Sequence, residues 1–317
     1  MTRIGLIGVG TWGINHLRAL TEIDCDLVCI ADVDSTKAAL AKQHGIPFFH
    51  DYQPLLSTVD AVVVTTPTDT HVQIVKDCLA AGKHVFVEKP MAATAAQSRA
   101  LEKLAESQKL VLSVGYLYRF NNAIRRAREL IKEAGELQYL TARYIHSTKP
   151  PRTDSGVIMN LGIHVIDILN FLTERTPSRI YAKKKNLLSD SYEDSAAILL
   201  DYNDFFATIE LSCTHPEKAR DLWIIAGNEK IYLDYFSQKI MRYPLKVSYN
   251  EVEREEPIVE EITANEPLKD ELQYFVSLID QEETQPELNK GRENWYTTRI
   301  CELCLESAQN GTELPVK

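Results

Sequence analysis

The chain has 317 residues, of which 44% are hydrophobic and 25% charged, and its formal net charge is −10 at pH 7. This balance is typical of a folded globular protein, and the length is sufficient for two domains. The acidic charge argues against non-specific nucleic-acid binding, which needs a basic surface. No apolar stretch approaches the length of a membrane span.

The six cysteines are scattered, mostly within predicted strands and helices. This usage favours a reduced, cytoplasmic protein in which cysteine acts as a small hydrophobic residue. Cys301 and Cys304 have the spacing of half a metal knuckle, but no second pair accompanies them. We therefore expect them to share one helix face and expect no metal site. The apolar amino terminus lacks the cleavage site of a secretion signal.

Strands and helices alternate over the first 119 residues. The pattern predicts strands at residues 3–9, 26–32, 60–66, 84–89 and 110–116, with helices at 13–20, 35–41, 70–81 and 94–108. Ser35 is expected to cap the second helix, and Gly82 to end the third in a left-handed conformation. This repetition predicts a doubly wound parallel sheet that is covered on both faces.

Residues 120–317 are expected to form a second, α/β domain. The predicted strands lie at residues 137–145, 179–185, 194–202, 205–212, 222–226 and 231–235, and the predicted helices at 123–134, 158–172, 268–279 and 295–308. Short turn-like gaps between the strands predict an open, mostly antiparallel sheet. The acidic stretch 251–261 is expected to be a solvated edge or loop.

A glycine-rich turn follows the first predicted strand. The segment Gly8-Val9-Gly10-Thr11-Trp12-Gly13 fits G-x-G-x-x-G and opens the first helix. The first glycine permits the tight turn, the second lets the backbone approach a pyrophosphate, and the third allows close helix packing. We therefore expect Gly8, Gly10, Thr11, Trp12 and Gly13 to bind a dinucleotide. Three turn glycines without a ligand are the alternative.

Asp32 ends the second predicted strand, about twenty residues beyond the glycine turn. A carboxylate there accepts hydrogen bonds from a ribose diol and repels a 2′-phosphate. No arginine lies beside it. The cofactor is therefore expected to be NAD rather than NADP. The alternative is that Asp32 is a turn residue before Asp34.

Lys89 is a charged residue at the end of an apolar strand. The strand 84–89 stops at Glu88, Lys89 and Pro90. Desolvating an ammonium costs several kcal/mol unless it is paired, so stability alone does not explain this lysine. Ligands of open α/β sheets bind at the carboxyl ends of the strands. We therefore expect Lys89 to meet a substrate.

A stripe of polar residues lies on the apolar helix 158–172. Asn160, His164 and Asp167 are four and three positions apart, so they share one face. Such a grouping in a buried helix indicates function, with His164 handling a proton and Asp167 orienting it; a satisfied core histidine is the alternative. Gly162, between them, is typical of a close approach by a ligand or another backbone. A metal site here lacks a third ligand at recognisable spacing.

Several segments together resemble the family of glucose-fructose oxidoreductase, inositol dehydrogenase and rhizopine catabolism proteins (Gfo/Idh/MocA). They occur in the family's order over the first 170 residues: residues 8–13, Thr65-Thr66-Pro67 with His71, Glu88-Lys89-Pro90, residues 115–120, and residues 156–162 with His164 and Asp167. The resemblance implies a Rossmann domain, which we place at residues 1–119. It also implies a substrate-binding and oligomerisation domain, which we place at residues 120–317, whose outer sheet face commonly forms a homodimer or homotetramer interface.

The resemblance also implies NAD-linked oxidation or reduction of a sugar or polyol carbon. Thr66, Pro67 and His71 would then line the nicotinamide side, and Glu88 and Lys89 would approach the nicotinamide ribose. Lys89 would hydrogen-bond the reacting hydroxyl and His164 would exchange its proton. Many relatives carry Asp at the position of Asn160, and because an amide cannot relay a proton, Asn160 is expected to position the substrate.

Asn160 before Leu-Gly-Ile-His is similar to the family branch that acts on nucleotide sugars, including 3-dehydrogenases of UDP-N-acetylglucosamine. Tyr118 and Asp167 are further candidates for substrate contacts. Lys149 and Arg152 would neutralise a diphosphate, or else form an ordinary basic loop. Three alternatives remain: a free sugar or inositol-type dehydrogenase, a non-catalytic dinucleotide-sensing regulator, and a reductase of a small imine or tetrapyrrole.

Overall fold

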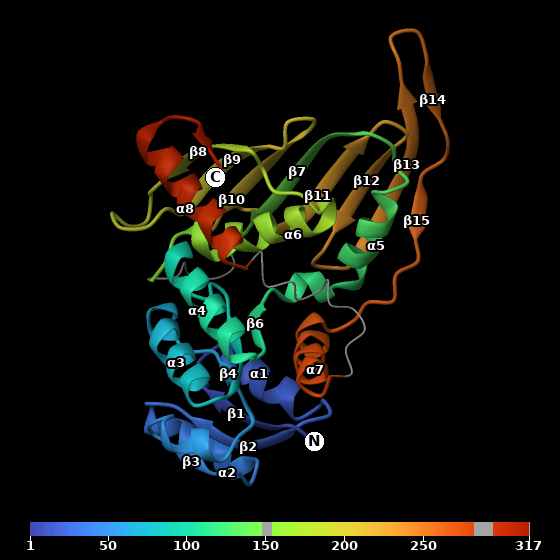
Figure 1. The fold of residues 1–317 in the computed structure, drawn as a ribbon. Helices are drawn as coiled ribbons and strands as arrows, with labels where there is room; N and C mark the ends of the chain where they lie inside the picture. Colours follow the sequence, from blue (N-terminus) through green and yellow to red (C-terminus); the bar gives the residue numbers. More distant parts are fainter. Residues whose placement is uncertain (148–153, 282–293, 317) are drawn as a thin grey trace. The chain divides into compact units, whose positions relative to one another are not determined.

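The structure is a computed structural model that describes residues 1–147, 154–281 and 294–316. The chain divides into two compact units (Figure 1). The first contains Met1–Leu117 and Glu266–Tyr296, and the second contains Tyr118–Asn265 and Thr297–Lys317.

The first unit is built on a six-stranded parallel sheet. Its strand order is β3-β2-β1-β4-β5-β6, and the strands are β1 (Arg3–Ile7), β2 (Asp26–Ala31), β3 (Phe48–Phe49), β4 (Ala61–Val64), β5 (His84–Glu88) and β6 (Leu112–Gly115). Strand β4 is buried throughout because a parallel sheet is covered on both faces. This order is that of a doubly wound dinucleotide-binding fold, which confirms the fold class predicted from the sequence.

Helices flank this sheet on both faces. They are α1 (Gly13–Leu20), α2 (Ala38–Gln43), α3 (Thr68–Ala80), α4 (Ala95–Gln108) and α7 (Pro267–Ile279), with short 3₁₀ turns at Ser35–Lys37 and Pro54–Ser57. Figure 1 shows α3 and α4 on one side of the strands and α1 and α7 on the other. Gly82 has a φ of +72° after α3, as expected. Asp34, rather than Ser35, caps the 3₁₀ turn, because its carboxylate accepts from the amide of Thr36.

Helix α7 belongs to the first unit, although the sequence places it in a domain beginning at residue 120. Leu272, Phe275 and Val276 pack into the same core as Ile4 and Phe86. The rings of Phe86 and Phe275 are 5.8 Å apart. Although α7 comes late in the chain, burial of its apolar stripe therefore packs it against the first sheet.

The second unit contains a mixed sheet, and among its described strands only β7 and β10 pair in parallel. The strand order is β14-β13-β12-β11-β7-β10-β9-β8-β16, with β15 also paired to β13. The strands are β7 (Leu137–Ile145), β8 (Arg179–Lys185), β9 (Ser195–Asp201), β10 (Phe206–Ser212), β11 (Ala219–Ala226), β12 (Glu229–Asp234), β13 (Lys239–Val247), β14 (Val252–Arg254), β15 (Ile258–Glu260) and β16 (Leu314–Pro315). The sequence did not predict β13; the acidic segment after it forms edge strands, in line with the expected solvated edge.

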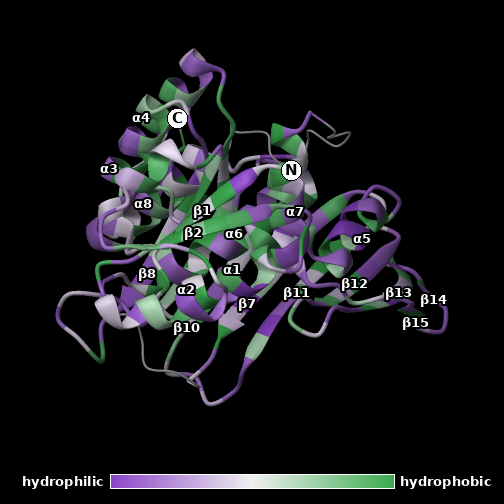
Figure 2. Ribbon diagram, turned by 90° about the horizontal axis from the view of Figure 1, so that it is seen from below, coloured by the Kyte–Doolittle hydropathy of each residue, from purple (hydrophilic) through white to green (hydrophobic). Residues whose placement is uncertain are grey.

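Helices of this unit are α5 (Asn122–Leu130), α6 (Ile163–Thr173) and α8 (Asn294–Asn310), together with a 3₁₀ turn at Leu117–Phe120 and a π-helical turn at Ile158–Gly162. Helices α5 and α6 pack against the sheet. Helix α6 and strands β1 and β2 carry mostly hydrophobic colours in Figure 2. On α6 every residue from Ile163 to Leu172 is buried, because packing surrounds it on all sides.

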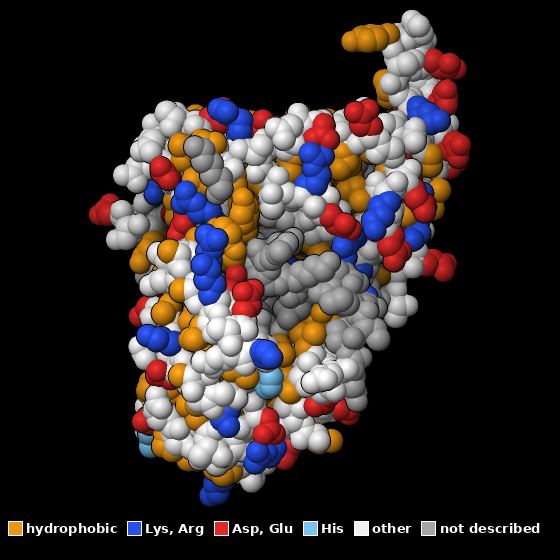
Figure 3. All heavy atoms as spheres, viewed as in Figure 1, with side chains coloured by type: hydrophobic (Ala, Val, Ile, Leu, Met, Phe, Trp, Pro, Cys, Tyr) orange, Lys and Arg blue, Asp and Glu red, His pale blue; other side chains and the backbone are white. Residues whose placement is uncertain are grey.

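The outward face of the same sheet carries large exposed side chains. Tyr139, Leu199 and Phe206 are 37%, 40% and 42% exposed, and the rings of Tyr139 and Phe206 stack 5.4 Å apart. A hairpin formed by β13 and β14 extends from this sheet, with Tyr249 fully exposed in its turn. Figure 3 shows an exposed hydrophobic side chain at its tip and acidic side chains along it.

Candidate active site

The glycine turn has the geometry that the sequence predicts. Gly8 has a φ of +90°, which side-chain-bearing residues rarely adopt. A Cβ on Gly13 would meet the carbonyl oxygen of Gly8 and Oγ1 of Thr65, whereas a Cβ on Gly10 would meet nothing within 4 Å. Open space beside Gly10 at the start of α1 fits a pyrophosphate, which needs close access to the backbone.

Asp32 lies directly after β2 and faces this turn. Its Oδ2 accepts from the amide of Val9 at 2.7 Å, and its Oδ1 accepts from the amide of Asp34 at 2.9 Å. The side chain is half-buried. The carboxylate is therefore fixed beside the glycine turn, which is the position that a ribose-binding acid requires.

Glu88, the last residue of β5, is buried and holds the glycine turn through a hydrogen bond from Trp12. Its Oε1 accepts from Nε1 of Trp12 at 2.6 Å and lies 2.7 Å from Nε2 of His16, while its Oε2 accepts from the amide of Lys89 at 3.1 Å. A Cβ on Gly115 would come within 3.0 Å of this carboxylate. Burial raises the pKa of Glu88, but the hydrogen bond and charge of His16, the charge of Lys89 and the hydrogen bond from Trp12 together lower it, so that the net shift is downward.

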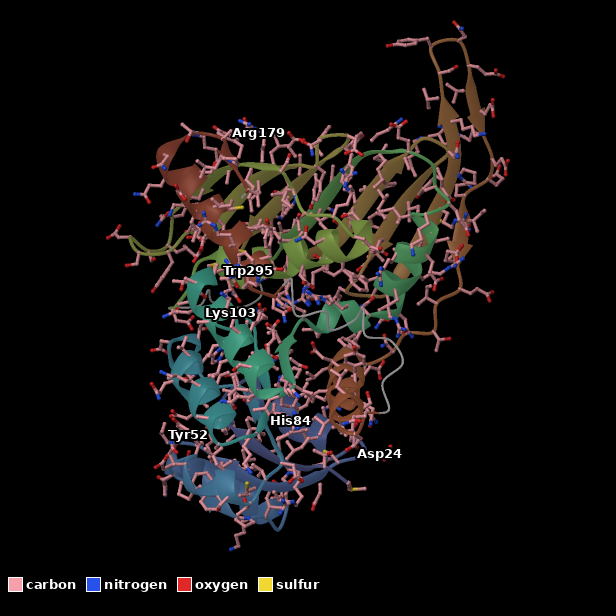
Figure 4. All side chains as sticks on the ribbon, in the orientation of Figure 1. Asp24, Tyr52, His84, Lys103, Arg179 and Trp295 are labelled. Carbon is pink, nitrogen blue, oxygen red and sulfur yellow. The ribbon has the colours of Figure 1, made fainter. Side chains whose placement is uncertain are left out.

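Lys89 follows Glu88 at the carboxyl end of β5 and is half-buried. The opposite end of the strand begins at His84, which is labelled in Figure 4 and whose Nδ1 accepts from the amide of Val111 at 2.9 Å. His84 thus lies at the amino end of β5, where it hydrogen-bonds the backbone before β6. Lys89 lies at the carboxyl end, which is where ligands of such sheets bind.

His71 joins the ends of two neighbouring strands. Its Nε2 lies 2.8 Å from the carbonyl oxygen of Thr66, after β4, and its Nδ1 lies 2.9 Å from the carbonyl oxygen of Pro90, after β5. The ring is buried, and Pro67 directly precedes α3. His71 therefore connects the backbone that follows β4 to the backbone that follows β5, next to Lys89.

The polar stripe predicted on the second unit's apolar helix begins in a π-helical turn. Asn160 lies in that turn, half-buried, and its amide donates to the carbonyl of Gly156 at 3.0 Å. His164 lies one turn later and is 7% exposed. Its ring meets Tyr118 edge-on at 5.2 Å and lies 6.3 Å from the ring of Tyr144. Single π turns within helices are frequent at functional sites.

Asp167, the third residue of the stripe, pairs with Arg119. The guanidinium Nε lies 3.1 Å and 3.0 Å from the two carboxylate oxygens, and Nη2 lies 2.5 Å from Oδ1. Both side chains are buried. Burial raises the pKa of Asp167, and the charge of Arg119 opposes that rise. The carboxylate thus serves an ion pair, in contrast to the sequence-based expectation that it orients His164.

Glu193 holds the start of this helix, and no sequence pattern predicts its role. Its Oε1 accepts from the amide of Ile158 at 3.0 Å, and its own carbonyl accepts from Val157. A Cβ on Gly156 would collide with its carboxylate. An acid at this position also interacts favourably with the helix dipole.

The predicted residues fall into two sets. Gly8, Asp32, Glu88 and Lys89 belong to the first unit, and Tyr118, Asn160, His164 and Asp167 belong to the second. Lys149 and Arg152 lie outside the described residues. Within the described residues, all six cysteines are free and no group of three or more His, Cys, Asp or Glu is arranged to hold a metal ion. No helix in the described part is long and apolar enough to span a bilayer.

A glycine turn with a fixed acid beside it, at the edge of a doubly wound parallel sheet, is the geometry of a dinucleotide-binding domain. Residues 2–116 match the family described as "Oxidoreductase family, NAD-binding Rossmann fold", and residues 124–232 match the "GFO/IDH/MocA C-terminal domain". The chain belongs to the GFO/IDH/MocA family of NAD(P)-dependent dehydrogenases, which act on CH–OH groups.

Named relatives cover most of the chain. It is 30% identical over 242 residues, 76% of each chain, to UDP-N-acetylglucosamine 3-dehydrogenase of Acidithiobacillus ferrooxidans. It is 31% identical over 202 residues, 61% of each chain, to inositol 2-dehydrogenase of Rhizobium meliloti. A solved structure of the Acidithiobacillus enzyme superposes with a TM-score of 0.87 over 98% of both chains at 25% identity.

Proposed function

We propose that this protein oxidises a CH–OH group of a nucleotide sugar, such as UDP-N-acetylglucosamine, to the 3-keto form with NAD⁺ as acceptor. The observation that carries the proposal is the position of Lys89 directly after β5, beside a Glu88 carboxylate that also holds the glycine turn through Trp12. A lysine at the carboxyl end of a strand, joined to a dinucleotide turn, is suited to hydrogen-bond the hydroxyl of a carbinol whose carbon gives up a hydride.

In this proposal two side chains share the proton work. Lys89 hydrogen-bonds the reacting hydroxyl, and His164 accepts its proton as the carbinol becomes a ketone. Asn160, as an amide, fixes the orientation of the sugar, and Tyr118 contributes to the same binding surface. Bound NAD⁺ supplies the hydride acceptor. The released products are a keto sugar, NADH and a proton.

NAD rather than NADP is proposed because of Asp32. Its carboxylate is held by the amides of Val9 and Asp34, so it cannot turn away from a 2′-phosphate without losing two hydrogen bonds. Thr11, Trp12, Thr66, Pro67 and His71 complete the proposed cofactor-binding set.

The test is to incubate the protein with NAD⁺ and a panel of sugars while NADH absorbance is followed. The panel contains UDP-N-acetylglucosamine, N-acetylglucosamine, glucose, glucuronate and myo-inositol. Turnover of the UDP-linked sugar with formation of its 3-keto product supports the proposal. Turnover of myo-inositol alone would contradict the nucleotide-sugar assignment and favour the second candidate.

That second candidate is a free sugar or polyol dehydrogenase. The inositol 2-dehydrogenase relative, with an identity as high as that of the nucleotide-sugar enzyme over a shorter span, is the observation in its favour. A dinucleotide-sensing regulator would not need Lys89 and His164, and both are present.

We also propose that a second copy of the chain covers the outward face of the second sheet. Outward residues pair in one row across seven strands, from Tyr181 through Leu199, Thr208, Thr141, Trp223 and Tyr232 to Met241. Aromatic and aliphatic side chains of this kind are enriched in homodimer interfaces. Sedimentation of Phe206→Glu should give a smaller species than the wild type; a monomeric wild-type protein would contradict this proposal.

A further inference from the structure

Arg220 is the polar residue of the second unit that the proposed chemistry leaves unexplained. It lies in β11 opposite Tyr144 of β7. Its Nη1 donates to the hydroxyl of Tyr118 at 3.0 Å, and Cζ lies 4.6 Å from the ring centre of Tyr144 and 5.0 Å from that of Phe236. Because Tyr118 also contacts His164, one tyrosine ring separates this guanidinium from the proposed catalytic histidine.

No carboxylate neutralises Arg220 within the described chain. Three other arginines of the same unit each reach an acid: Arg119 with Asp167, Arg143 with Asp221, and Arg242 with Glu229. Asp221 is adjacent to Arg220 in sequence, but alternation along the strand directs it to the opposite face, where it pairs with Arg143. The Nε atom of Arg220 is buried and makes no hydrogen bond to any described residue.

The surrounding tyrosines do not substitute for that missing acid. Burial raises the pKa of Tyr144 and of Tyr235 well above the ordinary tyrosine value, so both remain neutral at physiological pH. A guanidinium is charged at any such pH. A half-buried guanidinium that, among the described residues, contacts aromatic rings and a tyrosine hydroxyl but no carboxylate is unfavourable, and an anion brought by a ligand offsets this cost.

We propose that Arg220 binds an anionic group of the substrate at a subsite beside His164. The group is either the carboxylate of a sugar acid or the diphosphate of a nucleotide sugar, since the planar fork of arginine fits both. This assignment rests on the proposed sugar oxidation for the identity of the ligand. It assigns recognition of the anion to a residue of β11 and not to Lys149 or Arg152.

The test is calorimetric titration with UDP and, separately, with glucuronate, each in saturating NADH so that the dinucleotide site is filled and no turnover occurs. Wild type is compared with Arg220→Gln and with Arg143→Gln, which removes the same charge from the opposite face of the sheet. We expect Arg220→Gln to weaken binding roughly tenfold or more, as for loss of a hydrogen bond between charged groups, and Arg143→Gln to leave it within about twofold. Arg220→Lys should restore part of the affinity.

Binding of UDP alone would identify a diphosphate, and binding of glucuronate alone would identify a carboxylate. Affinity unchanged in Arg220→Gln, or wild type binding neither anion, would overturn the assignment. Oxidation of neutral sugars without anion binding would overturn it together with the nucleotide-sugar assignment, while leaving the second candidate, a free sugar or polyol dehydrogenase, intact. Arginine-dependent binding of UDP in a protein that oxidises no sugar would do the reverse.

Discussion

The Nε2 atom of His16 lies 2.7 Å from Oε1 of Glu88, and both side chains are buried. An ionised carboxylate only accepts hydrogen bonds, so Nε2 of His16 carries the proton. The contact joins helix α1, which follows the glycine turn, to β5, the strand that Lys89 directly follows. The glycine turn and the proposed catalytic lysine are thus held by one buried carboxylate.

Replacing Glu88 with Gln should therefore loosen both elements at once. The amide keeps the shape but loses the charge that His16 and Trp12 satisfy, so we expect a loss of roughly 1–3 kcal/mol in the free energy of unfolding, together with weaker NADH binding. Urea denaturation and NADH fluorescence titration measure the two effects. Trp12→Phe, which removes a single donor, is the matched smaller change. Unaltered stability in Glu88→Gln would contradict this role.

The same carboxylate makes stability depend on pH. The folded-state pKa of Glu88 is lowered from the ordinary value of 4.5, so its contribution is present above that pH and is lost as pH falls through the folded-state value. Stability of the wild type should therefore decrease below about pH 4.5 more steeply than that of Glu88→Gln. Parallel curves from pH 7 to pH 3 would show that Glu88 does not contribute.

Alanine should have different effects at two glycines of the turn: it should lower stability at Gly13 and NADH affinity at Gly10. Gly13→Ala pushes a methyl group into the carbonyl of Gly8 and should lower the free energy of unfolding by roughly 1–3 kcal/mol. Gly10→Ala points into open space, so stability should stay within about 0.5 kcal/mol while NADH binding weakens. Melting curves and NADH titration of the pair distinguish these effects. Normal NADH affinity in Gly10→Ala would place the pyrophosphate elsewhere.

Asp32→Asn tests the choice of cofactor. Asparagine still accepts from the amide of Val9 but no longer repels a 2′-phosphate. We expect the wild type to prefer NAD⁺, and the variant to lose about tenfold of that preference in kcat/KM, corresponding to about 1.4 kcal/mol. A wild type that uses NADP⁺ equally well would contradict the assignment.

Asp167→Ala should lower the free energy of unfolding. It leaves Arg119 buried without a counter-ion, which costs about 3–5 kcal/mol, whereas the double variant Arg119→Met, Asp167→Leu should be much closer to the wild type. Urea unfolding of the single and double variants measures the difference. A large rise in KM for the sugar with unchanged stability would instead return Asp167 to substrate binding.

Most of the fold could be predicted from the sequence because its elements have clear periodicity. Alternating residues 137–145 and 179–185 become β7 and β8 with the predicted bounds. Strand β13 was missed because Pro244 and interspersed basic residues interrupt its pattern, and pairing with β12 and β14 compensates. Helix α7 was assigned to the wrong unit because an apolar stripe does not specify which sheet it covers.

The site was predictable where a motif fixes backbone geometry, as at Gly8 and Gly13. It was not predictable where function depends on distant partners. His16 approaches Glu88 across 72 positions, and Arg220 approaches Tyr118 across 102. That Arg220 has no carboxylate partner among the described residues can be recognised only when its neighbours in the folded structure are known.

Lys89 is proposed to act on the hydroxyl of a sugar during NAD-dependent oxidation. The most direct measurement is NADH formation by Lys89→Met with saturating NAD⁺ and UDP-N-acetylglucosamine, alongside NADH affinity. Lys83→Met is the control, since Lys83 precedes the other end of β5 and donates to the carbonyl of Val59. We expect Lys89→Met to bind NADH normally and to turn over at least 100-fold more slowly, as for loss of general acid–base catalysis, and we expect Lys83→Met to remain active. Near-normal turnover in Lys89→Met would contradict it.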